Sequence, residues 1–294
     1  MITRFDHAVI AVRDLDEAMR AYSRLGFAVS RGGRHPGRGT ENAIIRFGLD
    51  YLELLALADE REARAAGLDD AALQGFQRGG LVDYALASDD LAADILRLRT
   101  AGLNVQGPFD GSRRRPDGTL LAWKTATIAQ AVPGFAHIRD PWPFLIQWLT
   151  PDAERLAGDK PGAQPNGTTR VWGISVIARD LDSAIAGYER GLGLELAGRT
   201  TLSDIAAERA HFTVGGARLD VLGSTGEGFV SQALAATGEG PFSVTLTTSD
   251  LEATRRYLAL AGILVSPTSD RADELLIAPE AACGARMIVR AEGA

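Results

Sequence analysis

The stretch Arg13-Asp14-Leu15-Asp16, followed by Tyr22 and Leu25-Gly26-Phe27, recurs far downstream as Arg179-Asp180-Leu181-Asp182, Tyr188 and Leu192-Gly193-Leu194. Two weaker copies begin at Asp90-Leu91 and Asp250-Leu251 and end at Ala101-Gly102 and Ala261-Gly262. In each copy the aspartate stands where a helix would begin, because its carboxylate can accept free backbone N–H groups of the first turn. The glycine stands where that helix would end. Repetition at this scale predicts a chain built from four copies of one small unit.

Apolar runs around each copy complete the unit. In the first copy a run over residues 6–12 precedes the helix, and further runs cover 27–30, 42–47 and 51–55. Their Val, Ile and aromatic content is typical of strands, so each unit is expected to be β-α-β-β-β. The later units begin near Leu81, Arg170 and Phe242, and their last strands are expected at 144–149, 217–222 and 286–290.

The best linker is the segment 151–168, which is rich in Pro, Gly, Asp and Asn and has no apolar period. It divides the chain into an N-terminal domain, 1–150, and a C-terminal domain, 169–294. The predicted class is α+β, with four βαβββ modules paired into two open-barrel domains.

Composition limits the function. The 294 residues are 46% hydrophobic and 23% charged, as in soluble globular proteins, and the formal charge of −7 gives no basic surface for nucleic acid. One cysteine, Cys283, excludes an internal disulfide and a thiolate metal cluster. No apolar stretch is long enough to span a bilayer, and the N-terminus lacks the pattern of a leader. We expect a cytoplasmic protein without nucleic-acid or membrane partners, and a homodimer is compatible with the sequence.

Paired modules of this kind resemble the vicinal oxygen chelate superfamily, and within it the glyoxalase-like domain proteins. The resemblance covers nearly the whole chain. It is carried by the motifs Asp6-His7, Arg13-Asp14-Leu15, Leu25-Gly26-Phe27, Gly33-Arg34-His35-Pro36, Gly39-Thr40-Glu41-Asn42, Tyr51-Leu52-Glu53-Leu54, Arg114-Arg115-Pro116-Asp117-Gly118 and Pro143-Phe144-Leu145-Ile146-Gln147-Trp148. This fold hosts many activities, so the activity does not follow from it.

The resemblance implies that metal ligands come from the first and last strand of each module. At those positions the N-terminal domain presents His7, Glu53, Asp83 and Gln147, a set able to enclose Zn²⁺, Mn²⁺, Ni²⁺ or Fe²⁺. The C-terminal domain presents Gly173, Asp220, Ser243 and Ile288, which cannot, so its site is expected to be degenerate. Each assignment has an alternative: His7 could be a core residue, Asp83 could orient His7 as a metal-free acid–base pair, and Gln147 could bind substrate.

Further candidates come from two loops and the pocket wall. His35, Thr40 and Asn42 border a Gly-rich loop and are expected to bind substrate, as is Trp123. One residue of the run Arg113-Arg114-Arg115, with Arg115 preferred, is expected to hold a substrate carboxylate through a bidentate contact. His137 is a weaker candidate at the rim.

Three functions remain open. The first is a metal-dependent isomerase or lyase acting on a small substrate with vicinal oxygens, with Glu53 and His7 as catalytic residues and the ion as Lewis acid. The second is a metal-free protein that binds or sequesters a small molecule, similar to bleomycin-resistance proteins. The third is an extradiol-type dioxygenase, but this needs two histidines and a carboxylate, and the aligned positions supply only His7.

Overall fold

The first half of the chain forms a closed barrel of eight strands. The computed structural model describes residues 1–128, 141–157, 162, 164–268 and 271–293. The barrel strands are β1 (Ile2–Val12), β2 (Val29–His35), β3 (Thr40–Arg46), β4 (Tyr51–Leu57), β5 (Gly80–Ser88), β6 (Val105–Arg114), β7 (Leu120–Ile128) and β8 (Phe144–Trp148). Their order is β1-β4-β3-β2-β6-β7-β8-β5, and a single pair, Arg34 with Arg114, joins the two modules along one seam.

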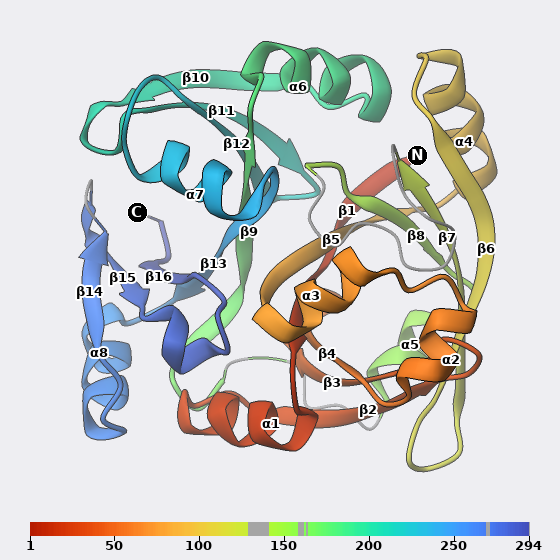
Figure 1. Ribbon diagram of the computed structural model, residues 1–294. Helices are drawn as coiled ribbons and strands as arrows, with labels where there is room; N and C mark the ends of the chain where they lie inside the picture. The colour runs from red at the N-terminus through yellow and green to blue at the C-terminus, as the bar shows by residue number, and fades with distance from the viewer. Residues whose placement is uncertain (129–140, 158–161, 163, 269–270, 294) are drawn as a thin grey trace.

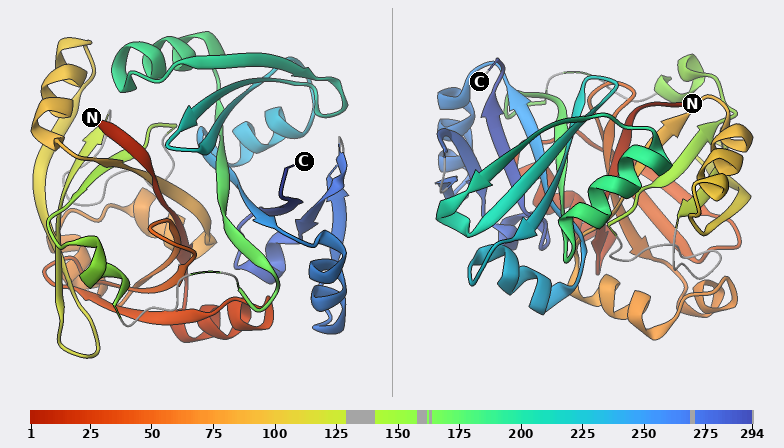
Figure 2. Two further views of the ribbon diagram at one scale, coloured as in Figure 1. Left: turned by 180° about the vertical axis from the view of Figure 1, so that it is seen from behind. Right: turned by 90° about the horizontal axis from the view of Figure 1, so that it is seen from above.

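The second half forms an eight-stranded sheet of matching order, β10-β11-β12-β9-β13-β16-β15-β14. Its strands are β9 (Thr168–Ala178), β10 (Leu196–Leu202), β11 (Ala207–Val214), β12 (Ala217–Ser224), β13 (Gly240–Thr248), β14 (Val265–Thr268), β15 (Arg271–Ile277) and β16 (Met287–Ala291). The two sheets lie side by side (Figures 1 and 2). The predicted α+β class with four βαβββ modules is confirmed, with the first sheet closed rather than open.

The helices that follow the four repeated aspartates occupy the predicted places: α1 (Leu15–Arg24), α4 (Leu91–Thr100), α6 (Leu181–Gly187) and α8 (Leu251–Leu260). Further helices are α2 (Glu60–Ala65), α3 (Asp70–Arg78), α7 (Phe229–Thr237) and α5 (Asp152–Leu156), the last within the segment predicted as a linker. The side chain of Asp14 accepts the N–H of Glu17 at 2.7 Å and caps α1. Gly26 follows at φ +82°, a left-handed conformation that favours glycine. None of the helices in the described ranges is long and apolar enough to cross a membrane.

The two halves share one hydrophobic core. A single cluster of buried side chains includes Tyr22 and Tyr84 from the first half and Tyr188 and Met287 from the second. The hydroxyls of Tyr84 and Tyr188 lie 3.0 Å apart. Burial of this surface holds the sheets together, so the division into two domains stays a prediction.

The segment 151–168, predicted as a linker, is anchored where it is described. Asn166 is buried and donates to the carbonyl of Leu25 at 2.8 Å. Gln164 accepts the N–H of Ala28 and donates to the carbonyl of Arg46. These amides satisfy backbone groups of the first half and so fix the start of the second half against it.

Short helices cover both ends of the barrel. Helix α3 lies across the end that faces the viewer in Figure 1, and α5 lies at the other end, seen in the left panel of Figure 2. Each contributes a buried side chain close to the barrel interior, Phe76 from α3 and Arg155 from α5. The strands and these two helices together define the walls of the site.

Candidate active site

A cavity of about 160 Å³ lies inside the first barrel. Its wall contains most of the predicted site residues together with a group of aromatic side chains. The lining residues used below are His7, His35, Thr40, Asn42, Tyr51, Glu53, Phe76, Asp83, Phe109, Arg113, Trp123, Phe144, Ile146 and Trp148. Each barrel strand turns alternate side chains inward, which explains why His7, Glu53 and Asn42 meet there.

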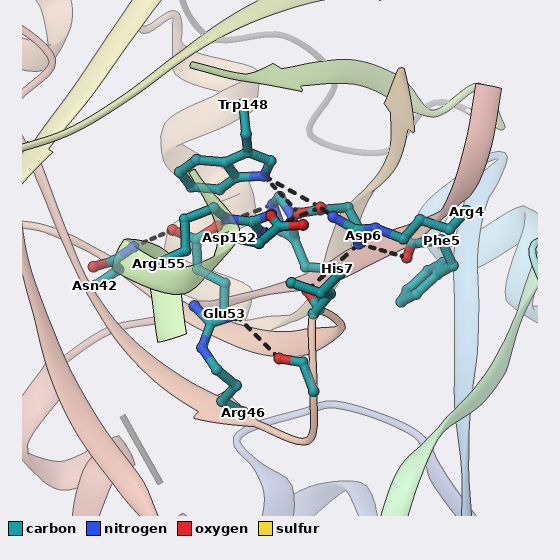
Figure 3. Close-up of polar contacts among 12 residues, drawn as sticks. Arg4, Phe5, Asp6, His7, Asn42, Arg46, Glu53, Trp148, Asp152 and Arg155 are labelled. Atoms are coloured by element: carbon teal, nitrogen blue, oxygen red, sulfur yellow. Dashed lines mark hydrogen bonds and ion pairs between the residues drawn. The ribbon is translucent and has the colours of Figure 1, made fainter. Parts of the chain in front are cut away.

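His7 on β1 lies between two carboxylates. Its Nε2 is 3.4 Å from Oε2 of Glu53 on β4, and its Nδ1 is 2.8 Å from Oδ1 of Asp6. The ring stacks on Tyr51 with centroids 4.4 Å apart and meets Phe144 edge-on. Because His7 is only 1% exposed, these contacts hold the imidazole in one orientation between the two acids (Figure 3).

Asp6 connects this pair to the far end of the barrel. It is fully buried and accepts from Arg4 at 2.7 Å and from the indole N–H of Trp148 at 3.2 Å. Arg155 from α5 lies 3.5 Å from Asp6 and stacks on the Trp148 ring. Figure 3 shows Trp148 and Arg155 converging on Asp6 behind His7. A buried carboxylate needs such partners to remain ionised, so these residues fix the charge behind the imidazole.

A second set of contacts approaches Glu53 from the other side. The Asn42 amide nitrogen donates to Glu53 Oε1, and the Asn42 oxygen accepts from Arg113 Nη1 at 3.1 Å. His35 Nε2 lies 3.4 Å from the Asn42 nitrogen and 3.9 Å from Glu53. His35 Nδ1 lies 2.8 Å from the Thr40 hydroxyl, so an N–H there leaves Nε2 as an acceptor.

The environment sets the charges of the site. Burial raises the pKa of Glu53, but the hydrogen bond and charge of His7, aided by His35 and Asn42, lower the pKa to about 2. Burial lowers the pKa of His7, yet Asp6 and Glu53 raise it above the usual value. Burial, with Arg113 nearby, lowers the pKa of His35 to about 4. At neutral pH Glu53 is therefore a carboxylate and His35 a neutral imidazole, while the protonated form of His7 is favoured more than in an ordinary histidine.

The cavity contains four of the five predicted substrate-binding residues. His35, Thr40, Asn42 and Trp123 line it, and Trp123 packs against Trp148 with ring centroids 5.1 Å apart. Asp83 lines it as well, and its carboxylate accepts the N–H of Tyr84. The weaker candidate His137 lies outside the described residues.

Two predicted site residues point elsewhere. Gln147 accepts the N–H of Leu91 at 3.2 Å and donates to Asp89 O at 2.9 Å, at the start of α4. Its neighbours Ile146 and Trp148 line the cavity instead, so the predicted alignment of β8 placed the wrong face of the strand inward. Arg115 donates to the carbonyls of Glu154, Arg155 and Ala157 at the end of α5, which makes its role structural.

One residue of the site was missed from the sequence, and another was a candidate that was not selected. Asp6 stands next to His7, but adjacent strand residues normally point to opposite faces, and nothing local marks the contact. Arg113 was one of three candidates for carboxylate binding in the run Arg113-Arg114-Arg115, of which Arg115 was preferred. The cavity-lining residue of the run is Arg113, which is 4% exposed.

The predicted metal site does not fit these donors. Among the described residues, no three His, Cys, Asp or Glu side chains are close enough together to hold an ion. Both ring nitrogens of His7 face carboxylates, and the Asn42 amide stands between His35 and Glu53. The β8 residues that line the cavity are Phe144, Ile146 and Trp148, none of which has a side chain that ligates a metal ion. We therefore assign no step to a metal ion.

The second sheet has different chemistry at the matching positions. Gly173 pairs with Arg218 where His7 pairs with Tyr51, and Asp220 occupies the ladder position of Glu53. Asp220 is bound by Arg218 Nε at 2.7 Å, and burial raises its pKa. Asp220 is paired with an arginine of its own strand, and the position that matches His7 is a glycine. The second sheet therefore has no acid–base pair like that of the first barrel.

The comparisons with known proteins agree with this fold. A family model described as a glyoxalase-like domain matches residues 5–192. A hypothetical protein from Staphylococcus aureus is similar over 99% of this chain and all of its own, with a TM-score of 0.69 and 15% identity. A mutant 4-hydroxymandelate synthase from Streptomyces coelicolor is similar over 98% of this chain and 92% of its own (TM-score 0.65, 14% identity). Methylmalonyl-CoA epimerase from Mycobacterium tuberculosis matches 44% of this chain and 91% of its own (TM-score 0.40, 21% identity). No curated protein matches the chain.

Proposed function

Because the chain belongs to the glyoxalase-like domain family, we propose that it binds a small organic molecule in the first-barrel cavity and transfers a proton on it, as an isomerase or a lyase. The observation that carries this proposal is the buried pair of His7 and Glu53, 3.4 Å apart in the cavity wall. A carboxylate and an imidazole at hydrogen-bond range can share and relay one proton.

The residues divide into two roles. Glu53 is ionised and removes a proton from the carbon next to a carbonyl group, which leaves the substrate as an enolate. Return of the proton to carbon completes an isomerisation, and departure of a leaving group with its electron pair completes a lyase reaction. His7, whose protonated form Asp6 favours, donates a hydrogen bond to the Glu53 carboxylate before the transfer. Asn42 donates to the other Glu53 oxygen and fixes the direction of the carboxylate. The low pKa of Glu53 makes it a weak base in the free protein, so a ligand that displaces water around it would have to raise that pKa.

The test is exchange of carbon-bound hydrogen. Small carbonyl compounds are incubated with the protein in D₂O, and loss of the proton signal next to the carbonyl is followed by NMR. We expect exchange with the wild type and at least about 100-fold slower exchange with Glu53→Gln, the lower bound typical of acid–base groups. Asp220→Asn is the matched control, since Asp220 holds the same ladder position in the second sheet. Equal exchange rates for wild type and Glu53→Gln would refute the proposal.

A second candidate is a binding protein that sequesters its ligand unchanged. The cavity wall supports it, because Phe76, Phe109, Trp123, Phe144 and Trp148 give an apolar ligand a large aromatic surface. Tight binding of an aromatic compound without exchange or turnover would favour this function over proton transfer.

A further inference from the structure

Arg113 is a buried cation that forms no ion pair with a carboxylate among the described residues. Its side chain lines the cavity and is 4% exposed, and its Nη1 donates to a neutral acceptor, the Asn42 oxygen, at 3.1 Å. Within the described residues its Nε is buried and has no hydrogen-bond partner. The nearest acid in this chain of contacts is Glu53, which lies on the other side of the Asn42 amide.

This arrangement lowers the free energy of unfolding of the ligand-free protein. A guanidinium remains charged in proteins, and burying a charge without a counter-ion is unfavourable. Burial lowers the pKa of Arg113 but leaves the group a cation. Asn42 keeps Arg113 and Glu53 from neutralising each other, because its amide binds one with its oxygen and the other with its nitrogen. The positive charge therefore stays available to whatever enters the cavity.

The backbone makes room for this contact. Any side chain at Gly32 on β2 would overlap Asn42 Oδ1 and Arg113 Nη1. The fold thus accommodates the Arg113–Asn42 pair with a residue that has no Cβ, and the pair fixes one end of the guanidinium. The remaining edge, Nε with Nη2, is the edge that binds a carboxylate through two parallel hydrogen bonds.

We propose that Arg113 binds the carboxylate of a small organic acid, so that the cavity takes a carboxylic acid with an apolar or aromatic body. The inference rests on the proposed function only in using the same cavity. The body of the ligand would lie against the aromatic wall of Trp123 and Phe109. The volume of about 160 Å³ is below the ~300–1,000 Å³ of pockets for drug-sized ligands, which limits the ligand to a small molecule.

The experiment compares carboxylates with their primary amides, which have nearly the same shape and no charge. Benzoate with benzamide, and phenylacetate with phenylacetamide, are titrated into the full chain by calorimetry or ligand-observed NMR. We expect the wild type to bind at least one carboxylate about 10- to 100-fold more tightly than its amide, as for hydrogen bonds to a charged group. Arg113→Met should abolish that preference, and Arg113→Lys should reduce it, since lysine keeps the charge but loses the fork.

The control is Arg114→Met. Arg114 is the exposed neighbour on the same strand, and its Nη1 donates to the carbonyl of Gly118, so its removal should leave the preference unchanged. Urea unfolding separates this role from a structural one, because removing an arginine that stabilises the fold would lower the free energy of unfolding. Because Arg113→Met removes an uncompensated buried charge, its free energy of unfolding should equal or exceed that of the wild type.

The outcomes separate this inference from the proposed function. Equal binding of acid and amide by the wild type, no binding of any acid tested, or a preference that survives Arg113→Met would each overturn it. A carboxylate preference without deuterium exchange would support the anion site while refuting proton transfer. Exchange on neutral carbonyl compounds together with equal binding of acids and amides would support proton transfer while refuting the anion site.

Discussion

Arg155 Nη2 lies 3.5 Å from Asp6 Oδ2, and neither side chain is more than 1% exposed. The pair joins the first strand of the barrel to α5, 149 positions later in the chain. The same Asp6 carboxylate binds His7, so the group that orients the imidazole in the cavity wall also ties α5 to the barrel. Site and stability are therefore coupled at this one residue.

Replacing Asp6 should be strongly destabilising. Asp6→Asn replaces the fully buried carboxylate between His7 and Arg155 with a neutral amide, so that His7 keeps only Glu53 and Arg155 only the exposed Asp152 as an acidic partner. Breaking a buried charge network by removing one member costs about 3–5 kcal/mol. Urea unfolding measures the loss. Asp152→Asn is the matched control, because Asp152 also binds Arg155, at 2.8 Å, but its own side chain is 56% exposed. Solvent screens an exposed carboxylate, so we expect its loss to cost about 0–1 kcal/mol. Similar losses for both variants would contradict the role assigned to Asp6.

The stability of the protein should depend on pH at both ends of a window set by His7 and Glu53. The folded-state pKa of Glu53 is lowered from 4.5 to about 2, so its contribution is present above pH 4.5 and is lost as the pH falls toward 2. The pKa of His7 is raised above 6.5, so its contribution is complete below pH 6.5 and is lost as the pH rises through the folded-state pKa.

The two contributions overlap between pH 4.5 and pH 6.5. His35 acts against the acid side of this range, because its folded-state pKa is lowered to about 4 and stability is therefore lost as the pH falls below 6.5. We expect maximal stability near pH 6.5. Urea midpoints measured from pH 3 to pH 9 test this. In Glu53→Gln the urea midpoint should change less with pH at both the acid and the alkaline end. The substitution removes the acid that titrates at low pH and one of the two acids that raise the pKa of His7. Identical pH profiles for wild type and variant would show that the pair is not coupled.

The fold was predictable because its signals are local and repeated. An aspartate cap such as Asp14 and a helix-ending glycine such as Gly26 act within a few residues, and four copies confirm one another. Closure of the first barrel was not predictable, since it depends on a single pair between distant strands, Arg34 with Arg114.

The site was predictable only where strand alternation and module equivalence agree. Both rules place His7 and Glu53 inward, and the structure brings them together. At Gln147 the last strand is short and its boundary was uncertain by one residue, which is enough to reverse the face. Asp6, Arg113 and Arg155 meet other elements from far along the chain, and no local pattern marks such contacts.

Metal removal should have little effect. Because the described donors do not form a group of three, we expect protein purified without chelator to contain far less than one equivalent of Zn, Mn, Ni or Fe. EDTA should leave the thermal unfolding midpoint and ligand binding unchanged. Elemental analysis decides this: one equivalent of metal in the wild type that is lost in Glu53→Gln would restore the metal site expected from the sequence.

Arg115 should contribute to stability rather than to ligand binding. Its guanidinium donates to three carbonyls at the end of α5, on Glu154, Arg155 and Ala157, and its side chain is 8% exposed. Arg115→Met leaves those acceptors without their charged donor, and we expect a loss of about 1–3 kcal/mol in the free energy of unfolding. The binding preference for carboxylates over amides should stay as in the wild type, the opposite of the pattern expected for Arg113→Met. Arg114→Met, at the exposed position between them, should change neither quantity. If Arg115→Met instead abolished the preference with stability intact, the carboxylate would bind where the sequence first suggested, and the assignment of Arg113 would be wrong.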